Sequence, residues 1–251
     1  MPIRFKDGGY WEIITRQMSI VTKSEQTRFK DGKIAVIGCG GIGGDAIAML
    51  ARMGIGELVL IDEDKFDLSN LNRQALSNFE NIGLSKSDVA KETVRKINPY
   101  TNVISYNERL TEDNIEKLVA DCDVIIDAVD NLITRIILSR YGKENKIPFI
   151  HGAIHGTIGQ MTVFNPENEV TYESMFGLPS QGKELTEEVK KEILDLTSEV
   201  PPVIGPNPNI IGCFESMEAF KIITGIGNVL EAPNLLTYDL LDFNSFKIET
   251  F

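Results

Sequence analysis

A glycine-rich segment at residues 38–44 is the first part of the sequence whose residue types indicate chemistry. Gly38, Gly40 and Gly43 fit the pattern Gly-x-Gly-x-x-Gly, directly after an apolar run and at the start of a helical stretch. Glycine permits a tight turn and lets the backbone approach a phosphate, and the N-terminus of the next helix supplies N–H donors. Asp62 lies 22 residues beyond Gly40 at the end of the next apolar run, where a carboxylate can bind ribose hydroxyls. The combination predicts a nucleotide site and does not separate NAD from ATP.

A second group of polar residues favours ATP. Asn70 and Arg73 lie in a loop soon after Asp62. Lys86 begins a helix farther along the chain, and Asp130 follows a later apolar run. All would emerge at the carboxyl edge of a parallel sheet, where ligands of open α/β folds bind. Taken alone, each of these residues could be an ordinary surface charge or helix cap. Together, two cations and a carboxylate able to hold Mg²⁺ are what phosphoryl-anhydride chemistry needs. A hydride-transfer site needs neither the cations nor the metal.

The elements that must position these residues alternate along the chain. Apolar runs predict buried strands at 33–37, 57–62, 103–106, 123–128 and 148–151. Helical spacing predicts helices between them at 45–53, 85–97, 112–120 and 131–145. Strands alternating with helices imply an α/β fold with a doubly wound, mainly parallel, Rossmann-like sheet.

The two ends of the chain differ from this pattern. Residues 10–30 predict an N-terminal helical arm, and residues 157–165 and 235–251 predict a C-terminal antiparallel extension. Between these strands we expect a charged helix at 183–196, a proline-rich stretch at 200–209 and a helix at 213–224. We therefore expect one domain over residues 1–251, with a nucleotide-binding core at 10–165, a crossover segment covering the substrate at 166–209, and a C-terminal helix and strands at 210–251.

Composition limits the possible partners. The chain of 251 residues has 42% hydrophobic residues and a net charge of −12. The acidity argues against nucleic acid, because phosphate backbones are bound by clustered lysine and arginine. No apolar run approaches the roughly 18 residues of a membrane span, and the N-terminus has no apolar signal core, so no membrane association is expected. Three scattered cysteines are too few for a disulfide framework, so we expect a cytoplasmic protein.

Several short segments of the chain, taken together and in this order, are more specific than any single motif. They comprise Arg16-Gln17, the glycine loop, Asp62, residues 67–74 (Asp-Leu-Ser-Asn-Leu-Asn-Arg-Gln), 83–86 (Gly-Leu-Ser-Lys), 127–131 (Asp-Ala-Val-Asp-Asn), and 151–153 (His-Gly-Ala) with Gly156, Gly159 and Gln160. With these residues the sequence resembles the ThiF/MoeB/HesA superfamily, the ubiquitin-activating-type adenylyltransferases. The resemblance spans roughly residues 10–165 and, weakly, 203–224.

The resemblance implies a role for each residue at the nucleotide. Asp62 would bind the ribose of ATP, and Asp130 would bind Mg²⁺. The triphosphate would be held by Asn70, Arg73 and Lys86 and would face the backbone of Gly40, Gly41 and Gly43.

The resemblance also implies the reaction and the oligomer. Arg16 would be lent to the ATP of a neighbouring subunit, which makes the functional unit a homodimer. A substrate carboxylate would attack the α-phosphate of ATP and release pyrophosphate, giving an acyl-adenylate. Positioning and charge neutralisation supply most of the rate of such a step, so no protein nucleophile is needed.

The sequence departs from many relatives where they bind structural zinc through two Cys-x-x-Cys pairs. The position of the first pair here holds Thr171-Tyr172-Glu173-Ser174, and no second pair occurs near the C-terminus. Three isolated cysteines cannot form a four-cysteine tetrahedral site, so we predict no zinc.

A second departure concerns the cysteine that several relatives use to take up the acyl group before a Gly-Pro element. The matching element is at residues 205–206, and the upstream position falls near Ser198, which has no evident base. Cys213 lies in an apolar helix and is predicted to pack, Cys122 to be core, and Cys39 to be a small residue of the phosphate loop. We expect the enzyme to stop at the adenylate and pass it to a downstream acyl acceptor or thiol protein.

Two histidines, His151 and His155, lie four residues apart near the predicted site. Gly152 and Gly156 favour a loop here, so structural or substrate-contacting roles are preferred over metal ligation.

Several hypotheses for the function stay open at this point. The substrate is either the C-terminal Gly-Gly carboxylate of a ubiquitin-like sulfur carrier or a small-molecule carboxylate. The missing cysteines favour a variant such as the HcgE type, which acts on the guanylylpyridinol precursor of the Fe-hydrogenase cofactor. An NAD-dependent oxidoreductase would leave Arg73, Lys86 and Asp130 without a role. A non-catalytic scaffold half of an activating enzyme would usually lose these phosphate-binding cations.

Overall fold

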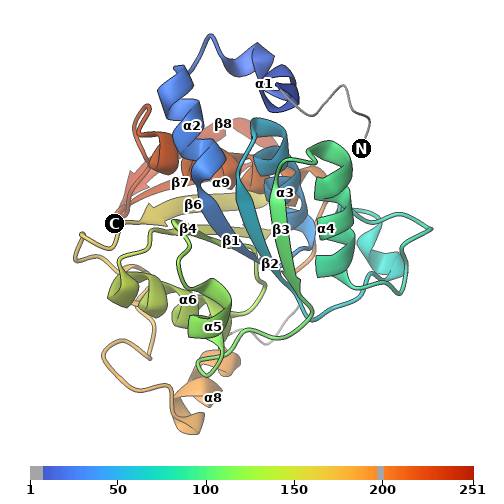
Figure 1. Cartoon of the computed structure of the whole chain (residues 1–251). Helices are drawn as coiled ribbons and strands as arrows, with labels where there is room; N and C mark the ends of the chain where they lie inside the picture. The colour runs from blue at the N-terminus through green and yellow to red at the C-terminus, as the bar shows by residue number, and fades with distance from the viewer. Residues whose placement is uncertain (1–7, 197–200) are drawn as a thin grey trace.

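The computed structural model describes residues 8–196 and 201–251 and shows one eight-stranded sheet with helices on both faces (Figure 1). In spatial order the strands are β3 (Asn102–Tyr106), β2 (Glu57–Ile61), β1 (Lys33–Ile37), β4 (Val124–Asp127), β5 (Phe149–His155), β6 (Ile158–Phe164), β7 (Asn234–Asp239) and β8 (Asp242–Thr250). The first five run parallel, and the pairs β5–β6, β6–β7 and β7–β8 are antiparallel. The predicted doubly wound, mainly parallel sheet with an antiparallel extension is confirmed.

The sheet separates two apolar cores. One core, on the face covered by α2 (Lys23–Asp31), α3 (Gly41–Met53), α4 (Lys86–Ile97) and α9 (Pro206–Thr224), receives Ile34 and Val36 of β1. The other, on the face of α5 (Ile115–Val119), α6 (Leu132–Asn145), α7 (Tyr172–Met175) and α8 (Glu187–Asp195), receives Ala35 and Ile37. Burial on both faces explains why the central parallel strands β1, β2 and β4 are almost entirely apolar.

Strand register brings the carboxyl ends of the parallel strands to one edge. Ile37 of β1 pairs with Ile61 of β2 and with Asp127 of β4, and Asp127 pairs in turn with His151 of β5. The loops that follow β1, β2 and β4 therefore leave the sheet side by side, which is what a ligand site at this edge requires.

The N-terminal arm consists of α1 (Gly9–Ile13), the short 3-10 helix η2 (Thr15–Gln17) and α2. Thr22 begins α2 with a capping box, in which its backbone N–H donates to Glu25 Oε2 at 2.6 Å. Tyr10 donates a hydrogen bond to the carbonyl oxygen of Gly54 (2.7 Å), and Gln17 donates to that of Met53 (2.9 Å). The arm is thus attached to the C-terminal end of α3.

Helix α9 begins at Pro206, so the predicted start at residue 213 was wrong. Prolines in the first turn of a helix lose no hydrogen bond, which lets the proline-rich stretch form that turn. Gly212 lies in the middle of the helix because a Cβ there would collide with the carbonyl oxygen of Ile42 in α3. Helix α9 is thus seven residues longer than predicted and packs closely against α3.

Strand β5 is also longer than predicted. It runs to His155 because its backbone pairs with β6 as far as Ile158. His155 therefore lies in the same strand as His151, and the loop predicted from Gly152 and Gly156 does not begin between the two histidines. His151 is fully buried, whereas His155 is exposed. In the described ranges, no helix is long and apolar enough to cross a membrane.

Candidate functional site

The glycine loop joins β1 to α3 in a conformation that depends on glycine. Gly38 has φ +93°, and a Cβ at this residue would collide with the carbonyl oxygen of Ala128. A Cβ at Gly43 would collide with the carbonyl oxygen of Gly38. Gly40 is the N-cap of α3, so the N–H groups of Gly41 and the two residues after it have no acceptor within the helix. These donors and the positive end of the helix can bind a phosphate.

Asp62 follows β2 and is fixed beside this loop. Its Oδ2 accepts a hydrogen bond from the Cys39 N–H at 2.7 Å, and its Oδ1 accepts one from the Asp64 N–H at 2.8 Å. Burial raises the pKa of Asp62, while these two N–H groups lower it. Each carboxylate oxygen keeps a lone pair that can accept a hydrogen bond from a ribose hydroxyl.

Lys86 is the first residue of α4, after the N-cap Ser85. Its Nζ lies 2.8 Å from Asp64 Oδ2, and the lysine side chain is 10% exposed while that of Asp64 is 63% exposed. An ammonium has three donors, so this pair leaves two for a phosphate oxygen. The carboxylate of Asp64 was not anticipated at this position.

Asn70 and Arg73 lie in the loop formed around the 3-10 helix η3 (Leu68–Asn70). Asn70 is buried, and its side-chain oxygen accepts from the Asp67 N–H at 3.0 Å. Arg73 is partly exposed and uses Nη1 to donate to Ser69 O (2.9 Å) and Asn72 Oδ1 (3.0 Å). These bonds order the guanidinium and leave its other N–H groups for a ligand.

Two residues that sequence analysis did not select complete this side of the site. Gln74 is buried against Gly40, and its side-chain oxygen has no hydrogen-bond partner among the described residues. Asn209 of α9, with its amide nitrogen turned towards them, donates to Arg73 O, Gly205 O and Asp45 Oδ2 at 3.1 Å each. Gln74 adjoins Arg73 in the matched motif, which was a usable signal, whereas no local pattern marks Asn209.

Asp130 lies in the loop after β4, beside the glycine loop. The loop leaves the sheet at Ala128, whose N–H donates to Ile37 O at 2.9 Å, and it ends at Asn131, the N-cap of α6, which accepts from the Thr134 N–H at 2.9 Å. The Asp130 side chain is exposed, and no described lysine, arginine or histidine pairs with it. An unpaired carboxylate facing solvent fits Mg²⁺, which keeps several waters and takes one or two carboxylates plus substrate phosphates.

Arg16 is not brought to this site within the chain. It is exposed in η2, next to Gln17, whose side chain contacts Met53 at the C-terminal end of α3. The glycine loop is at the other end of that 13-residue helix, which spans about 20 Å. Arg16 of the same chain is therefore remote from the nucleotide position.

The cysteines divide into two buried residues and one exposed residue. Cys122 is buried as predicted, and burial raises its pKa to about 12. Cys39, in the glycine loop, is buried as well. Cys213 is exposed, so its predicted packing role was wrong. It lies on the side of α9 away from the buried Ile211, and partial desolvation with Asp45 nearby raises its pKa, which disfavours the thiolate. Ser198 lies outside the described residues.

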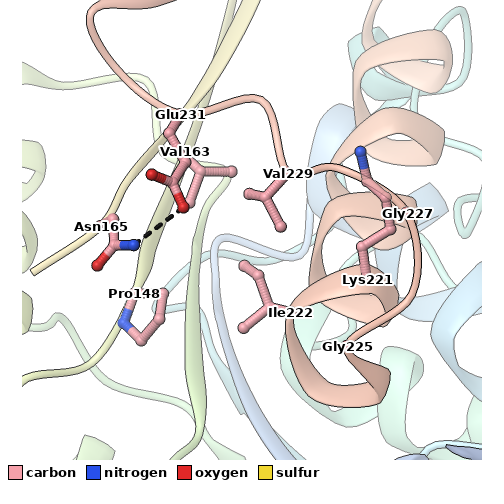
Figure 2. Close-up of a pocket in the computed structure, with 9 residues that line it drawn as sticks. All are labelled: Pro148, Val163, Asn165, Lys221, Ile222, Gly225, Gly227, Val229 and Glu231. Carbon is pink, nitrogen blue, oxygen red and sulfur yellow. Dashed lines mark hydrogen bonds between the residues drawn. The ribbon is translucent and has the colours of Figure 1, made fainter.

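A pocket of about 260 Å³ lies at the opposite edge of the sheet (Figure 2). It adjoins Pro148, before β5, and Asn165, after β6. Its charged groups are already engaged: Glu231 accepts from Asn165 at 2.9 Å, and Lys221 donates to Asn228 O at 2.6 Å. This pocket is separate from the nucleotide site.

The glycine loop, Asp62, Lys86, Arg73 and Asp130 all lie at the carboxyl edge of a doubly wound sheet, where the sequence predicts a nucleotide. A family model described as the ThiF family matches residues 14–251. The chain therefore belongs to the ThiF family.

Relatives with assigned names agree with this membership. A probable molybdopterin-synthase adenylyltransferase of Gracilaria tenuistipitata is 37% identical over 227 residues, which cover 90% of this chain and 61% of that protein. The SAMP-activating enzyme E1 of Haloferax volcanii is 34% identical over 90% of this chain and 79% of its own length. The molybdopterin-synthase adenylyltransferase of Haemophilus influenzae is 32% identical over 89% of this chain and 87% of its own length. The chain thus spans only about three fifths of the length of the Gracilaria relative.

Solved structures show the same fold. Crystalline PaaA superposes with a TM-score of 0.80 at 24% identity, covering 97% of this chain and 84% of that one. Escherichia coli MccB crystallised with ATP gives a TM-score of 0.78 at 22% identity, covering 100% of this chain and 73% of the MccB chain.

Proposed function

We propose that the protein is an ATP- and Mg²⁺-dependent adenylyltransferase that converts a substrate carboxylate to an acyl-adenylate and releases pyrophosphate. The observation that carries this proposal is the placement of Asp62, Lys86 and the loops of Arg73 and Asp130 around the start of α3. Asp62 accepts a hydrogen bond from the Cys39 N–H, and Lys86 is held by Asp64 beside it. The backbone of Arg73 lies against Gly41, and the backbone just before Asp130 lies against Gly38. Names of relatives that contain the word adenylyltransferase support it.

The chemistry follows from the charges at this edge. Asp62 accepts hydrogen bonds from the ribose, and the first-turn N–H groups of α3 bind phosphate oxygens. Lys86 and Arg73 neutralise the triphosphate, which lowers the repulsion felt by an approaching carboxylate. Mg²⁺ held by Asp130 would stabilise the departing pyrophosphate. The carboxylate forms a bond to the α-phosphorus as the bond to the bridging oxygen of pyrophosphate breaks, so no protein group needs to become covalently attached.

A homodimer completes the site. Arg16 is exposed and remote from the glycine loop of its own chain, so it can act only on the nucleotide of a second copy. An arginine supplied in this way would add a third cation to the triphosphate.

The relatives favour a protein substrate. One is named for SAMP and others for molybdopterin synthase, and MccB has been crystallised with MccA. The leading substrate is therefore the C-terminal Gly-Gly carboxylate of a ubiquitin-like sulfur carrier. The second candidate is a small-molecule carboxylate, such as guanylylpyridinol in the HcgE type. It is kept because this chain lacks the cysteine pairs of the usual enzymes that activate sulfur carriers.

The reaction would end at the adenylate, in the cytoplasm, with transfer to a separate acceptor. The raised pKa of Cys213 disfavours a covalent cysteine step. The Cys213→Ser variant should therefore turn over like the wild type, and a thioester trapped on Cys213 would contradict this part of the proposal.

The test is ATP–pyrophosphate exchange measured with a panel of carboxylates. One arm uses a ubiquitin-like sulfur carrier with its Gly-Gly end and the same carrier without its last glycine; the other uses guanylylpyridinol. Exchange that requires one of these carboxylates and Mg²⁺ is the expected result. NAD binding without ATP binding would overturn the proposal, and ATP binding without exchange for either substrate kind would indicate a non-catalytic scaffold.

A further inference from the structure

A buried group of three charged or titratable residues lies next to the loop that carries Asp130. We call Asp127, Arg135 and His151 the Asp127 cluster. Asp127 Oδ2 lies 3.0 Å from Arg135 Nε and 2.8 Å from His151 Nδ1. The side chains of Asp127 and His151 are 0% exposed, and that of Arg135 is 12% exposed. The cluster joins the end of β4 to β5 and to α6.

Each member of the cluster has a defined hydrogen-bonding role. Burial lowers the pKa of His151, although Asp127 opposes the change, so the imidazole is neutral. A neutral imidazole has one donor and one acceptor. Nδ1–H then donates to Asp127, and Nε2 accepts from the Gln160 amide at 3.3 Å. The buried charges are thus one carboxylate and one guanidinium, and removing either would leave the other unpaired at a large cost in stability.

The cluster holds the backbone immediately before Asp130. The Val129 N–H donates to Asp127 Oδ1 at 3.2 Å, and Arg135 Nη2 donates to the Val129 carbonyl oxygen at 2.5 Å. Arg135 Nη2 also approaches the carbonyl oxygen of Gly152 at 3.4 Å, which ties the loop to β5. Both polar groups of Val129 are therefore bonded to the cluster.

The residue after Asp130 is fixed independently. Asn131 caps α6 through its bond from the Thr134 N–H. Asp130 is thus an exposed residue between two held neighbours, and the direction of its carboxylate depends on the peptide that joins it to Val129. A catalytic carboxylate on a loop needs such support, because an ångström of misplacement weakens its contact with a ligand.

We propose that Arg135 and His151 are positioning residues that set the direction of the Asp130 carboxylate for Mg²⁺. This inference rests on the proposed function, since it assigns Asp130 to the metal of the nucleotide. Arg135 acts on Val129 directly, and His151 acts by fixing the carboxylate of Asp127. Neither residue contacts the nucleotide itself.

The test compares variants of Arg135 with a matched arginine on the same helix. Arg140 of α6 forms a two-pronged ion pair with Glu173 at 2.8 and 2.9 Å and has no bond to the loop. Binding of a non-cleavable ATP analogue is measured by calorimetry across a series of Mg²⁺ concentrations. Arg135→Gln should raise the half-saturating Mg²⁺ concentration about tenfold and leave metal-free nucleotide binding unchanged. Arg140→Gln should change neither quantity, whatever it does to stability.

Two variants of His151 give a second comparison: one keeps an N–H donor to Asp127, and the other removes it. His151→Asn keeps an N–H near the position of Nδ1 and should retain the Mg²⁺ dependence of the wild type, whereas His151→Leu should shift it in the direction of Arg135→Gln. Arg135→Lys, which keeps the charge but cannot reach Asp127 and Val129 together, replaces Arg135→Gln if the latter does not fold. Hydrogen exchange at the Val129 and Asp130 amides should accelerate in the shifted variants.

The outcomes separate this inference from the proposed function. Wild-type protein without Mg²⁺-dependent nucleotide binding would overturn both, and so would an Asp130→Ala variant with wild-type Mg²⁺ dependence. The positioning role alone would be overturned by a different result. In that case the Asp130→Ala variant is impaired, but the folded His151→Leu protein and a folded Arg135 variant (Arg135→Gln or Arg135→Lys) keep the Mg²⁺ dependence of the wild type.

Discussion

Lys86 Nζ lies 2.8 Å from Asp64 Oδ2 at the edge where the nucleotide is expected, so the lysine is held by a carboxylate that is itself 63% exposed. Because Asp64 remains solvated, losing this pair costs little stability. The cation is therefore present for a ligand, and its contribution to binding can be measured without a large change in folding.

Lys86→Ala should lower kcat/KM for ATP by about 100-fold, because a preorganised cation is lost from the triphosphate. The free energy of unfolding should change by less than about 1 kcal/mol. Steady-state exchange kinetics and urea unfolding measure these quantities. Lys96→Ala, an exposed lysine of the same helix, is the control and should match the wild type. Equal kinetics for the two variants would remove Lys86 from the site.

Asp130→Ala should lower the rate of adenylylation by about 1,000-fold while leaving the fold intact, because the metal loses its protein ligand. Its exposure means that no buried partner is left unpaired. The exposed Asp113 provides the control, since Asp113→Ala should retain full turnover. Undiminished turnover of the Asp130 variant would contradict the metal role.

Mixing two inactive variants tests whether Arg16 acts across a subunit boundary. Arg16→Ala and Asp130→Ala should each be inactive as pure dimers. A mixed dimer contains one site with an intact Asp130 and an intact Arg16 from the other subunit, so random exchange of subunits should restore about a quarter of the wild-type activity. Activity is measured before and after co-refolding at equal amounts. No recovery, in a mixture shown to contain mixed dimers, would place Arg16 outside the active site.

Glu215 of α9 should make stability depend on pH. Burial raises the pKa of Glu215 well above its usual range, Asp127 raises it further, and Arg135 opposes them. Neither of its carboxylate oxygens has a partner among the described residues. Because the folded protein holds this proton more tightly than the unfolded chain, the stabilisation is complete below the unfolded pKa near 4.5 and is lost as the pH rises towards the folded pKa.

Glu215→Gln should therefore raise the free energy of unfolding at pH 8 by about 1–3 kcal/mol and change it little at pH 4.5. Urea unfolding at the two pH values measures the difference. Glu218→Gln on the same helix is a contrasting control, because Glu218 pairs with Lys221 at 2.5 Å and its loss should destabilise the protein at pH 8. A Glu215 variant that is less stable at pH 8 would contradict the buried, protonated carboxyl.

Much of the fold could be predicted because the parallel strands are buried on both faces. The bounds of β1 match the predicted run 33–37, since a two-sided apolar environment requires an uninterrupted apolar sequence. The end of β5 and the start of α9 could not be predicted, because long-range contacts decide them. Asn207, in the first turn of α9, is buried by donating to Gly156 O and Ile158 O at 3.0 and 2.9 Å.

The candidate site, like the fold, has parts that local sequence predicts and parts that long-range contacts decide. The spacing of Gly38, Gly43 and Asp62 reflects a local unit of strand, turn, helix and strand, so sequence alone locates it. Asn209 of α9 contacts Arg73 from more than 100 residues along the chain, and Asp127 contacts His151 on the adjacent strand. Such contacts depend on how the layers pack, which no local pattern records. The catalytic roles remain predictions.

The two apolar cores on either face of the sheet also bear on how the family diversifies. Helices α3, α4 and α9 and the glycine loop belong to one core, whereas α5 to α8 belong to the other. Neither core shares a residue with the other, so drift in one layer does not require compensating changes in the other. The layer that carries the glycine loop can therefore keep its packing while side chains of the opposite layer change. Relatives 32–34% identical to this chain carry names that refer to SAMP and to molybdopterin synthase.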